Sequence, residues 1–328
     1  MIFSIVCSVF NSEKYIKDCL NSIISCSFSD WELIILDDGS TDSTGLICDN
    51  YAKMDSRIKV YHNNNVGPYN ERIKGFLLSK GEYILNIDAD DSFCANIFDT
   101  LLTIISNSNP DLIIFNENAV SEKANNKLDT NIYNEMLLHD KNEIFKNYFK
   151  NYLLMQGLHR KCFKRSLLDN AFDLSPRDSR MFEDGLFSLK ILNASNNVFF
   201  CNECLYNYRE INDESLTKKF KKYDSFDFGI VLEKMIMIDD NSSLEKQTKA
   251  DCLSQIILLL INYVVFMSKN GSTKKQIKNL RNNETIKKIL KFNVSKRRLG
   301  KRRFVLFAFA NRQFTLLKFL CGMIDYEI

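Results

Sequence analysis

The sequence has no hydrophobic run long enough to suggest a membrane-spanning helix. Its most apolar segment, residues 256–267, contains Asn262 and falls short of the roughly 18 apolar residues that cross a bilayer. Residues 1–9 are apolar but lack the basic leader and the cleavage site of a signal peptide, so we expect a strand there. These absences favour a cytoplasmic protein that is soluble or attached to the membrane surface.

Several common site motifs are also missing. No G-x-G-x-x-G follows the first apolar run and no G-x-x-x-x-G-K-[ST] occurs anywhere, which disfavours a dehydrogenase and a phosphate-loop kinase. None of the three histidines lies near a nucleophile-elbow pattern, so a Ser/His or Cys/His triad is not expected. Cys201-x-x-Cys204 has no second cysteine pair to complete a zinc site, so we interpret it as two packed strand residues. The ten scattered cysteines fit a reducing cytoplasm.

The length and composition are those of a globular protein. A chain of 328 residues predicts one large domain with a smaller appendage, and 45% of the residues are hydrophobic. The net charge of +3 hides a basic cluster at residues 296–303, where six of eight residues are Lys or Arg. We expect an anionic partner for this cluster.

Short apolar runs alternate with helical patterns along the first two thirds of the chain. The run at residues 2–9 is typical of a strand covered on both faces, and Asn11 or Ser12 is expected to cap the helix after it. Further strands are expected at residues 31–36, 58–61, 83–87 and 112–115, and helices at residues 43–54, 70–79, 97–106, 142–155 and 181–194. This alternation predicts an α/β fold with a central, mostly parallel sheet flanked by helices.

The rest of the chain predicts a closing pair of strands and then a helical region. Residues 121–134 are expected to be a surface loop, residues 198–201 and 205–208 the two strands, and residues 226–238 and 253–267 long helices. We therefore expect domains at 1–217 and 218–328. Residues 304–324, which follow the basic cluster, fit either an interfacial helix on an anionic membrane or a helix packed in the core. Nucleic acid is not expected as a partner, because no stacking aromatics line a basic groove.

Three polar clusters follow predicted strands, at Phe10-Asn11, Asp37-Asp38 and Asp88-Ala89-Asp90-Asp91. In doubly wound sheets, ligands bind outside the carboxyl ends of the strands. The last cluster supplies the hard oxygen ligands that Mg²⁺ or Mn²⁺ prefers, although a solvated loop or a helix cap gives the same pattern. An EF-hand is not expected, because the Gly and the twelfth-position Glu of its loop are missing. Glu183 and Asp184 open a helical pattern, where acids also favour the helix dipole.

Taken in order, four segments resemble the motifs of family 2 glycosyltransferases, inverting enzymes with the GT-A fold. Residues 8–16 are similar to P-x-Y-N-x-E-x-Y-L, with the proline replaced and Phe10 in place of tyrosine. Residues 37–42 match D-D-G-S-T-D, and residues 65–75 resemble N-x-G-x-x-x-A-R-N-x-G with Glu71 and Ile73 as departures. Residues 81–91 lead into an aspartate pattern similar to D-x-D-D.

Three later segments extend the resemblance to about residue 217. Residues 161–165 resemble K-L-Y-x-R, with His159 where tryptophan is common, and residues 182–184 resemble F-E-D. Tyr208-Arg209 with Ser215 resembles a Y-R-x(n)-S segment. The family membership that these motifs indicate implies a nucleotide-sugar donor, in particular a UDP-sugar, and a divalent metal, Mn²⁺ or Mg²⁺.

The resemblance also assigns roles to residues of this chain. Phe10 would stack on the base beside Asn11, Asp38 would accept a hydrogen bond from a uracil imide, and Asp37 would hold the turn. Asp88 would reach the ribose or the metal, and Asp90 would ligate the metal directly. Asp91 would support that ion or cap the next helix, and Arg72 would balance charge or orient carboxylates. Asp184 would be the catalytic base that takes the acceptor proton, with Glu183 in reserve.

The expected activity is transfer of one sugar to a hydroxyl of a glycan acceptor, such as a lipid-linked oligosaccharide. The pathway would be surface polysaccharide synthesis (O-antigen, capsule or lipooligosaccharide), on the inner face of the cell membrane. A sugar-1-phosphate nucleotidyltransferase is an alternative, although it needs a Gly-rich basic loop that residues 8–11 do not provide. A catalytically inactive nucleotide-sugar-binding scaffold is the other alternative. Calorimetric UDP binding without transfer would identify it.

Overall fold

The computed structural model describes residues 1–121, 127–129, 134–152, 155–169, 183–210, 227–269, 272–295, 299–311 and 313–322. Its backbone contacts divide the chain into two compact units, residues 1–140 with 156–221 and residues 141–155 with 222–328. The expected boundary at residue 217, Ser215, most of the loop at 121–134 and residues 296–298 lie outside the described residues.

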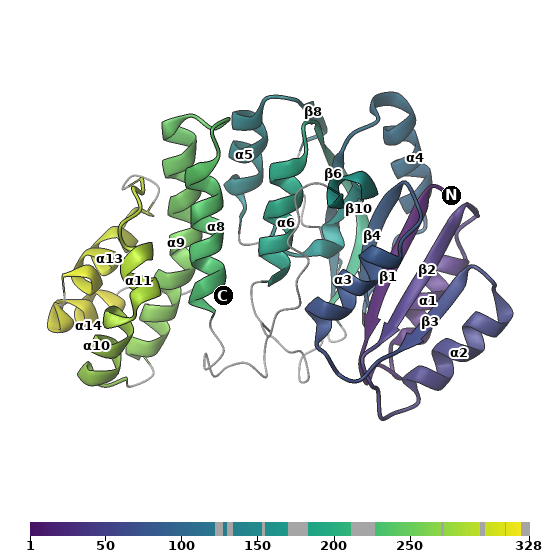
Figure 1. Ribbon diagram of the computed structural model, residues 1–328, viewed down its shortest axis with the longest axis horizontal. Helices are drawn as coiled ribbons and strands as arrows, with labels where there is room; N and C mark the ends of the chain where they lie inside the picture. Colours follow the sequence, from purple (N-terminus) through teal and green to yellow (C-terminus); the bar gives the residue numbers. More distant parts are fainter. Residues whose placement is uncertain are drawn as a thin grey trace. The chain divides into compact units, whose positions relative to one another are not determined.

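The first unit is built on a ten-stranded mixed sheet (Figure 1). Four parallel strands form one half, in the order β3 (Ile58–His62), β2 (Trp31–Asp37), β1 (Phe3–Val9) and β4 (Tyr83–Asp88). Strand β9 (Lys161–Lys164) lies antiparallel between β4 and β6 (Leu112–Ser121), and β10 (Val198–Glu210) runs parallel to β6. Three short antiparallel strands complete it: β5 (Ser92–Phe93), β7 (Lys127–Asp129) and β8 (Met136–Leu138). The expected α/β fold is confirmed.

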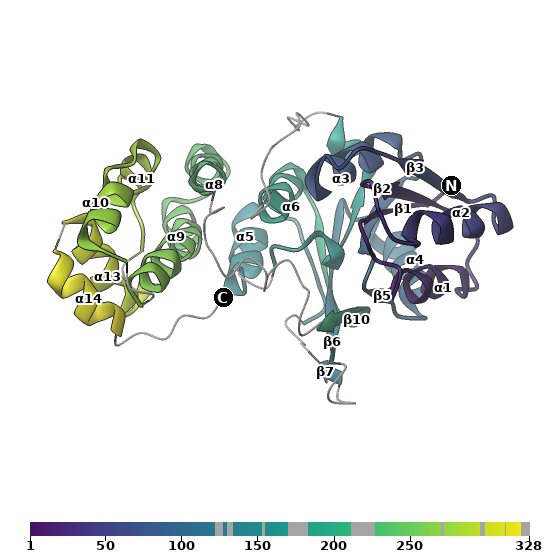
Figure 2. The ribbon, with the colours of Figure 1, turned by 90° about the horizontal axis from the view of Figure 1, so that it is seen from below.

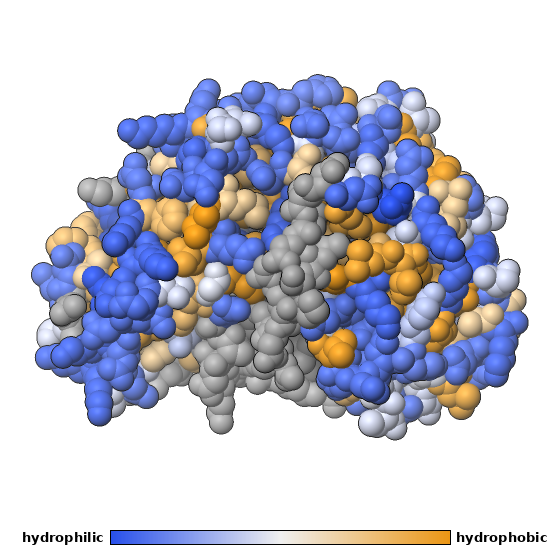
Figure 3. Space-filling view, in the orientation of Figure 1, coloured by the Kyte–Doolittle hydropathy of each residue, from blue (hydrophilic) through white to orange (hydrophobic). Residues whose placement is uncertain are grey.

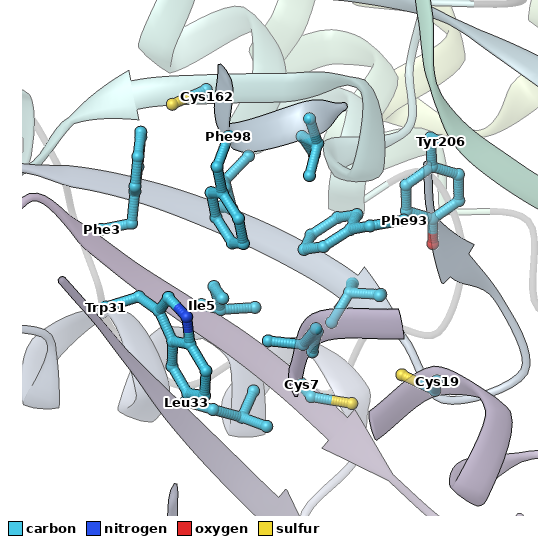
Figure 4. Packing of buried hydrophobic residues seen from close by; sticks show 14 of the residues in the cluster. Phe3, Ile5, Cys7, Cys19, Trp31, Leu33, Phe93, Phe98, Cys162 and Tyr206 are labelled. Atoms are coloured by element: carbon cyan, nitrogen blue, oxygen red, sulfur yellow. The ribbon is translucent and has the colours of Figure 1, made fainter. Parts of the chain in front are cut away.

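Helices cover both faces of this sheet. Phe3, Ile5 and Cys7 of β1 belong to a core cluster that includes buried residues of α1 (Ile16–Ile24) and α4 (Ile97–Ser108) (Figure 4). The alternate residue Val6 faces α3 (Pro68–Leu78), where a Cβ atom on Gly75 would lie 2.4 Å from Val6 Cγ1. Helix α3 can therefore approach the sheet this closely because residue 75 is glycine. Two covered faces explain why these strands read as continuous apolar runs.

The remaining elements of the first unit connect these strands. They are α2 (Thr44–Met54), α6 (Glu183–Ala194) and the 3₁₀ turns η1 (Leu158–Arg160) and η2 (Arg165–Leu168). Tyr206 of β10 packs edge-on against Phe93, with ring centroids 6.0 Å apart (Figure 4).

Two local predictions are wrong. Helix α1 begins after Tyr15 without a side-chain cap, because Asn11 and Ser12 instead tie the loop after β1 to the loop after β2. The Asn11 Oδ1 atom accepts a hydrogen bond from Thr41 N at 2.8 Å, and Ser12 N donates to Thr44 Oγ1 at 2.7 Å. Residues 198–201 and 205–208 form one strand, β10, rather than a pair, because register shifts between residues 200 and 206 interrupt its alternation without turning the chain.

The second unit is helical (Figure 2). Its long helix α9 (Lys246–Lys269) contacts α5 (Lys141–Lys150), α8 (Phe228–Asp240), α10 (Lys274–Asn282), α13 (Arg302–Ala310) and α14 (Phe314–Gly322), and α11 (Glu284–Ile289) contacts α8. By length and composition, α9 is the one helix of the described residues that could cross a membrane, but 67% of its most apolar window is buried inside the structure. That burial is typical of a core helix. The segment at 304–324 contains two helices, α13 and α14, rather than one.

Candidate active site

The register of the parallel strands brings the three polar clusters to one edge of the sheet. Val9 of β1 pairs with Asp37 of β2, and Ser8 of β1 pairs with Asp88 of β4. Asp37 and Asp88 therefore lie on the two strands flanking β1, about 10 Å apart across two strand spacings. Phe10 and Asn11 leave β1 between them.

Asp37 and Asp38 are buried and hold loops at this edge. The Asp37 carboxylate accepts a hydrogen bond from Ser40 N at 3.0 Å and pairs with His62 Nδ1 at 2.8 Å, so it holds its own turn. The Asp38 carboxylate accepts from Val66 N at 2.5 Å and from Gly67 N at 3.0 Å. Both aspartates are thus fixed in place by the main chain.

Phe10 is an exposed aromatic side chain at the same edge. It is 47% exposed although the strand before it is buried. Because Asn11 adopts a positive φ of 49° and bonds to the loop after β2, the chain turns sharply at the end of β1. An exposed phenyl ring on an anchored turn provides a flat surface for a planar ligand.

Arg72 joins the acidic turn after β4 to the first turn of α6. Its Nη2 atom donates to Asp88 Oδ1 at 2.9 Å, and its Nη1 atom donates to Asp184 Oδ1 at 2.7 Å. Burial alone would raise the pKa of Asp88, but the Arg72 guanidinium, with His159 and a hydrogen bond from Asn86, lowers that pKa overall. Burial would likewise lower the pKa of Arg72, but Asp184 and Asp88 raise it, so Arg72 stays charged. Three residues far apart in the sequence therefore form one charged cluster.

The other two aspartates of the turn have carboxylates that are hard to ionise. Burial and then the charge of Asp88 raise the pKa of Asp90. Burial, with the charges of Asp88 and Asp90, raises the pKa of Asp91 to about 8. The Asp91 carboxylate accepts hydrogen bonds from Tyr206 Oη at 2.7 Å and Arg209 N at 2.7 Å, so it ties the turn to β10 and caps no helix. The positive groups around this turn therefore do not fully neutralise its three carboxylates.

These carboxylates fit a hard divalent cation. In the part of the chain that the structure describes, no three His, Cys, Asp or Glu side chains converge into a complete ligand set. Asp88 and Asp90 offer carboxylate oxygens at one turn. Burial and then repulsion by Asp88 raise the pKa of Asp90, and a cation would relieve that repulsion. The site therefore suits an ion held by one or two carboxylates, with its other ligands supplied by a phosphate-bearing molecule or by water.

Glu183 and Asp184 differ in access although they are neighbours in the first turn of α6. The Asp184 side chain is 33% exposed, whereas Glu183 is buried. Only Asp184 can meet a molecule that enters from solvent, so the geometry favours it over Glu183 for proton transfer.

His159 lies at this site although its sequence pattern gave it no role. Its Nε2 atom lies 2.7 Å from Glu117 Oε2, and its ring centroid lies 4.9 Å from that of Tyr206. The Tyr206 hydroxyl donates to Asp91 and accepts from Asp88 N, which links His159 to the acidic turn. The partners of His159 lie on β6 and β10, far away in the sequence, so no local pattern indicates its role. Its place beside the motif at 161–165 is the one signal that the sequence offers.

Comparisons with known proteins identify a family and several relatives of this chain. The family model for glycosyl transferase family 2 matches residues 4–172. EpsH of Bacillus subtilis strain 168, provisionally named a glycosyltransferase, is 30% identical over 256 residues, which cover 75% of this chain and 72% of EpsH.

The poly(ribitol-phosphate) beta-N-acetylglucosaminyltransferase TarS of Staphylococcus aureus is 23% identical over 78% of this chain and 44% of TarS. A crystal structure of TarS residues 1–349 with UDP-GlcNAc superposes with a TM-score of 0.76 at 19% identity, covering 98% of this chain and 91% of that one. A structure of GalNAc-T7 with UDP, GalNAc and Mn²⁺ has a TM-score of 0.51 at 14% identity, covering 65% and 44%. These superpositions show a shared fold.

Proposed function

This chain is a family 2 glycosyltransferase with the GT-A fold, and from that premise we propose that it transfers one sugar from a UDP-sugar to a hydroxyl of a glycan acceptor. The sugar is transferred with inversion at its anomeric carbon. The UDP part of the proposal is supported by the TarS structure, which has the same fold and contains UDP-GlcNAc. Residues 1–217 are the proposed catalytic domain.

The contact of Arg72 with both Asp88 and Asp184 carries this proposal. It connects the end of β4, where we place the donor diphosphate, to the helix that supplies the proposed base. In an inverting transfer the base removes the acceptor proton on the sugar face opposite the leaving group. Asp184 is partly exposed and is held by Arg72 Nη1 at 2.7 Å, so an acceptor can reach it in a fixed position, as a base requires. Glu183 is the reserve candidate.

The uridine is proposed to bind beside β1 and β2. Phe10 stacks on the uracil ring, and Asn11 keeps the turn that presents it. Asp38 accepts from the uracil imide, since each of its oxygens has a second lone pair beyond the bond to Val66 or Gly67. Asp37 holds the turn. Arg72 offers positive charge to the diphosphate while it orients Asp184.

Mn²⁺ or Mg²⁺ is the proposed cofactor, with Asp90 as its direct ligand and Asp88 as the second carboxylate. When bound, such an ion neutralises the charge that develops on the diphosphate as the bond to the sugar breaks. Asp91 is a positioning residue, because it accepts hydrogen bonds from Tyr206 and Arg209 that fix the turn carrying Asp88 and Asp90.

The proposed acceptor is a lipid-linked oligosaccharide of a surface polysaccharide pathway (O-antigen, capsule or lipooligosaccharide). The enzyme would then work in the cytoplasm on the inner face of the cell membrane. A polymeric acceptor is supported by TarS, whose name describes transfer of N-acetylglucosamine to poly(ribitol-phosphate).

A donor screen tests the proposal. We expect a UDP-sugar with Mn²⁺ or Mg²⁺ to raise the melting temperature, because a ligand that binds only the folded state stabilises it by RT ln(1 + [L]/Kd). Chelation of the metal should remove most of this shift. The matching GDP-sugar or ADP-sugar is the control, and an equal shift with those donors would contradict the uridine site. A UDP-sugar that binds but is never consumed would indicate an inactive scaffold.

A further inference from the structure

The positive charge of the chain is concentrated in one part of the helical unit. Residues 272–322 contain fifteen Lys and Arg residues and one acidic residue, Glu284, which gives +14. The rest of the chain therefore has 29 basic and 40 acidic residues, or −11, and the overall +3 is the sum of two opposite charges. This segment forms α10, α11, α13 and α14, which lie together in Figures 1 and 2.

Helix α13 has two opposite faces. Val305, Ala308 and Phe309 are buried, and α13 contacts α9 and α14. The other side exposes Arg303, Phe304 and Phe307, which we call the amphipathic face of α13. Phe304 is 48% exposed and Phe307 is 54% exposed, and residues three and four apart lie side by side on a helix.

The charged and aromatic groups of this face lie next to each other. The Arg303 guanidinium lies over the Phe304 ring, 4.9 Å from its centroid, and Lys301 is exposed just before the helix. Arg281 Nε donates to Ala310 O at 3.1 Å, which places the end of α10 beside the end of α13. Elsewhere on α10, Lys274, Lys275 and Lys278 are exposed. Apolar side chains are interspersed in the largely hydrophilic surface of the helical region seen in Figure 3.

We propose that the amphipathic face of α13 docks on an anionic lipid bilayer, with Phe304 and Phe307 entering the headgroup boundary and Lys301 and Arg303 contacting the headgroups, while the other basic residues of the segment add to the attraction. Exposed aromatics beside Lys and Arg on a helix lying in the membrane plane are the physical signature of interfacial binding. The surface gives the proposed membrane location a structural basis. It does not depend on the transferase chemistry.

A bilayer fits this face better than a soluble polyanion. A charged polymer would satisfy the basic residues but would leave both phenyl rings in water, since the rings gain only from an apolar phase. The concentrated positive charge attracts any anionic surface. The two exposed phenyl rings favour a bilayer over a soluble polyanion.

Vesicle flotation of the full chain tests this inference, with vesicles of phosphatidylcholine alone or mixed with phosphatidylglycerol. We expect binding to the mixed vesicles only. Phe304→Ser with Phe307→Ser should weaken it by about tenfold or more. The matched control is Leu46→Ser with Leu77→Ser, which removes two side chains of 64% and 62% exposure from helices of the other unit and should change nothing.

Charge is tested separately. Lys301→Gln with Arg303→Gln should weaken binding about fivefold for each charge removed, whereas Lys17→Gln with Lys53→Gln, two exposed helical lysines of the other unit, should not. UDP-sugar binding should be unchanged in every variant, which separates this inference from the proposed function. Failure to bind the anionic vesicles would overturn the inference. So would binding that survives loss of both phenyl rings, because that result identifies a purely electrostatic surface for a polyanion.

Discussion

Replacing Arg72 should destabilise the first unit and disconnect the two halves of its site. In Arg72→Gln the side chain is shorter, loses its charge and keeps only one terminal nitrogen that can donate, where Arg72 uses two. Asp88 and Asp184 would then face each other without the cation that now lies between them, 2.9 and 2.7 Å from their oxygens. A buried ion pair broken on one side leaves an uncompensated charge, and that charge is what makes the change costly.

The expected cost follows from the exposure of the three side chains. Removing one partner of a fully buried pair costs about 3–5 kcal/mol. The Arg72 side chain is 11% exposed, but Asp88 and Asp184 are 29% and 33% exposed, so water screens part of the loss. We therefore expect about 2–3 kcal/mol in the free energy of unfolding. For a unit of this size that corresponds to a melting temperature lower by about 4–12 °C.

The cost should also depend on pH in a defined direction. Asp88 has a lowered pKa in the folded protein, so its contribution to stability is present above its unfolded pKa and is lost as pH falls through the folded pKa. Without Arg72, burial raises the pKa of Asp88 instead. As pH falls, Asp88 is then protonated in the variant before it is protonated in wild type, and the unpaired buried charge is removed. The difference between wild type and Arg72→Gln should therefore shrink as pH is lowered from neutral towards about 4.5.

Urea unfolding of wild type and variant at neutral and acidic pH measures both quantities. Arg57→Gln is the matched control, because Arg57 also forms a forked ion pair, with Asp55 at 2.7 Å, but in the same unit away from the site. Because the Arg57 side chain is 31% exposed, against 11% for Arg72, and pairs with one carboxylate rather than two, its replacement should cost only about 1 kcal/mol. The reasoning would be refuted if Arg72→Gln were no more costly than Arg57→Gln, or if its cost did not change with pH.

Two further predictions concern the same unit. Asp91→Asn removes a carboxyl whose pKa is raised to about 8 in the folded protein. That raised pKa makes wild type lose stability as pH rises from about 4 to about 8. Without divalent ions, the variant should therefore gain stability relative to wild type between pH 5.5 and 8.5. Urea titrations at those two pH values check this, and a constant difference would contradict it. Gly75→Ala should destabilise by about 1–3 kcal/mol, because its Cβ would lie 2.4 Å from Val6 Cγ1. A melting curve unchanged from wild type would show that α3 can move away from the sheet.

The sequence predicts the parallel half of the sheet well because each strand there is a buried apolar run that ends in polar residues. Ser8 and Val9 lie in register with Asp88 and Asp37, so strand order alone brings the predicted clusters to one edge. Strand β9 was not predicted, because it begins with Lys161, a residue type that normally indicates a surface. Burial lowers the pKa of Lys161 to about 7, and its ammonium group donates to Gly157 O.

The sequence predicts which residues belong to the site better than it predicts which of them contact one another. Arg72 and Asp184 are 112 residues apart, and a motif shows that two such residues occur without showing that they touch. His159 was missed for the same reason, because its partners lie on other strands. The cap expected at Asn11 was wrong because the side chain that could have capped α1 bonds to the neighbouring loop instead.

The central claim, that the end of β4 and the start of α6 form one catalytic site, is tested most directly by Asp184→Asn. Calorimetry should show the UDP-sugar binding this variant with Mn²⁺ about as tightly as it binds wild type, while single-turnover transfer to the acceptor falls by about 10²–10⁴-fold, the usual contribution of a general base. Transfer by Asp184→Asn at the wild-type rate would contradict the account.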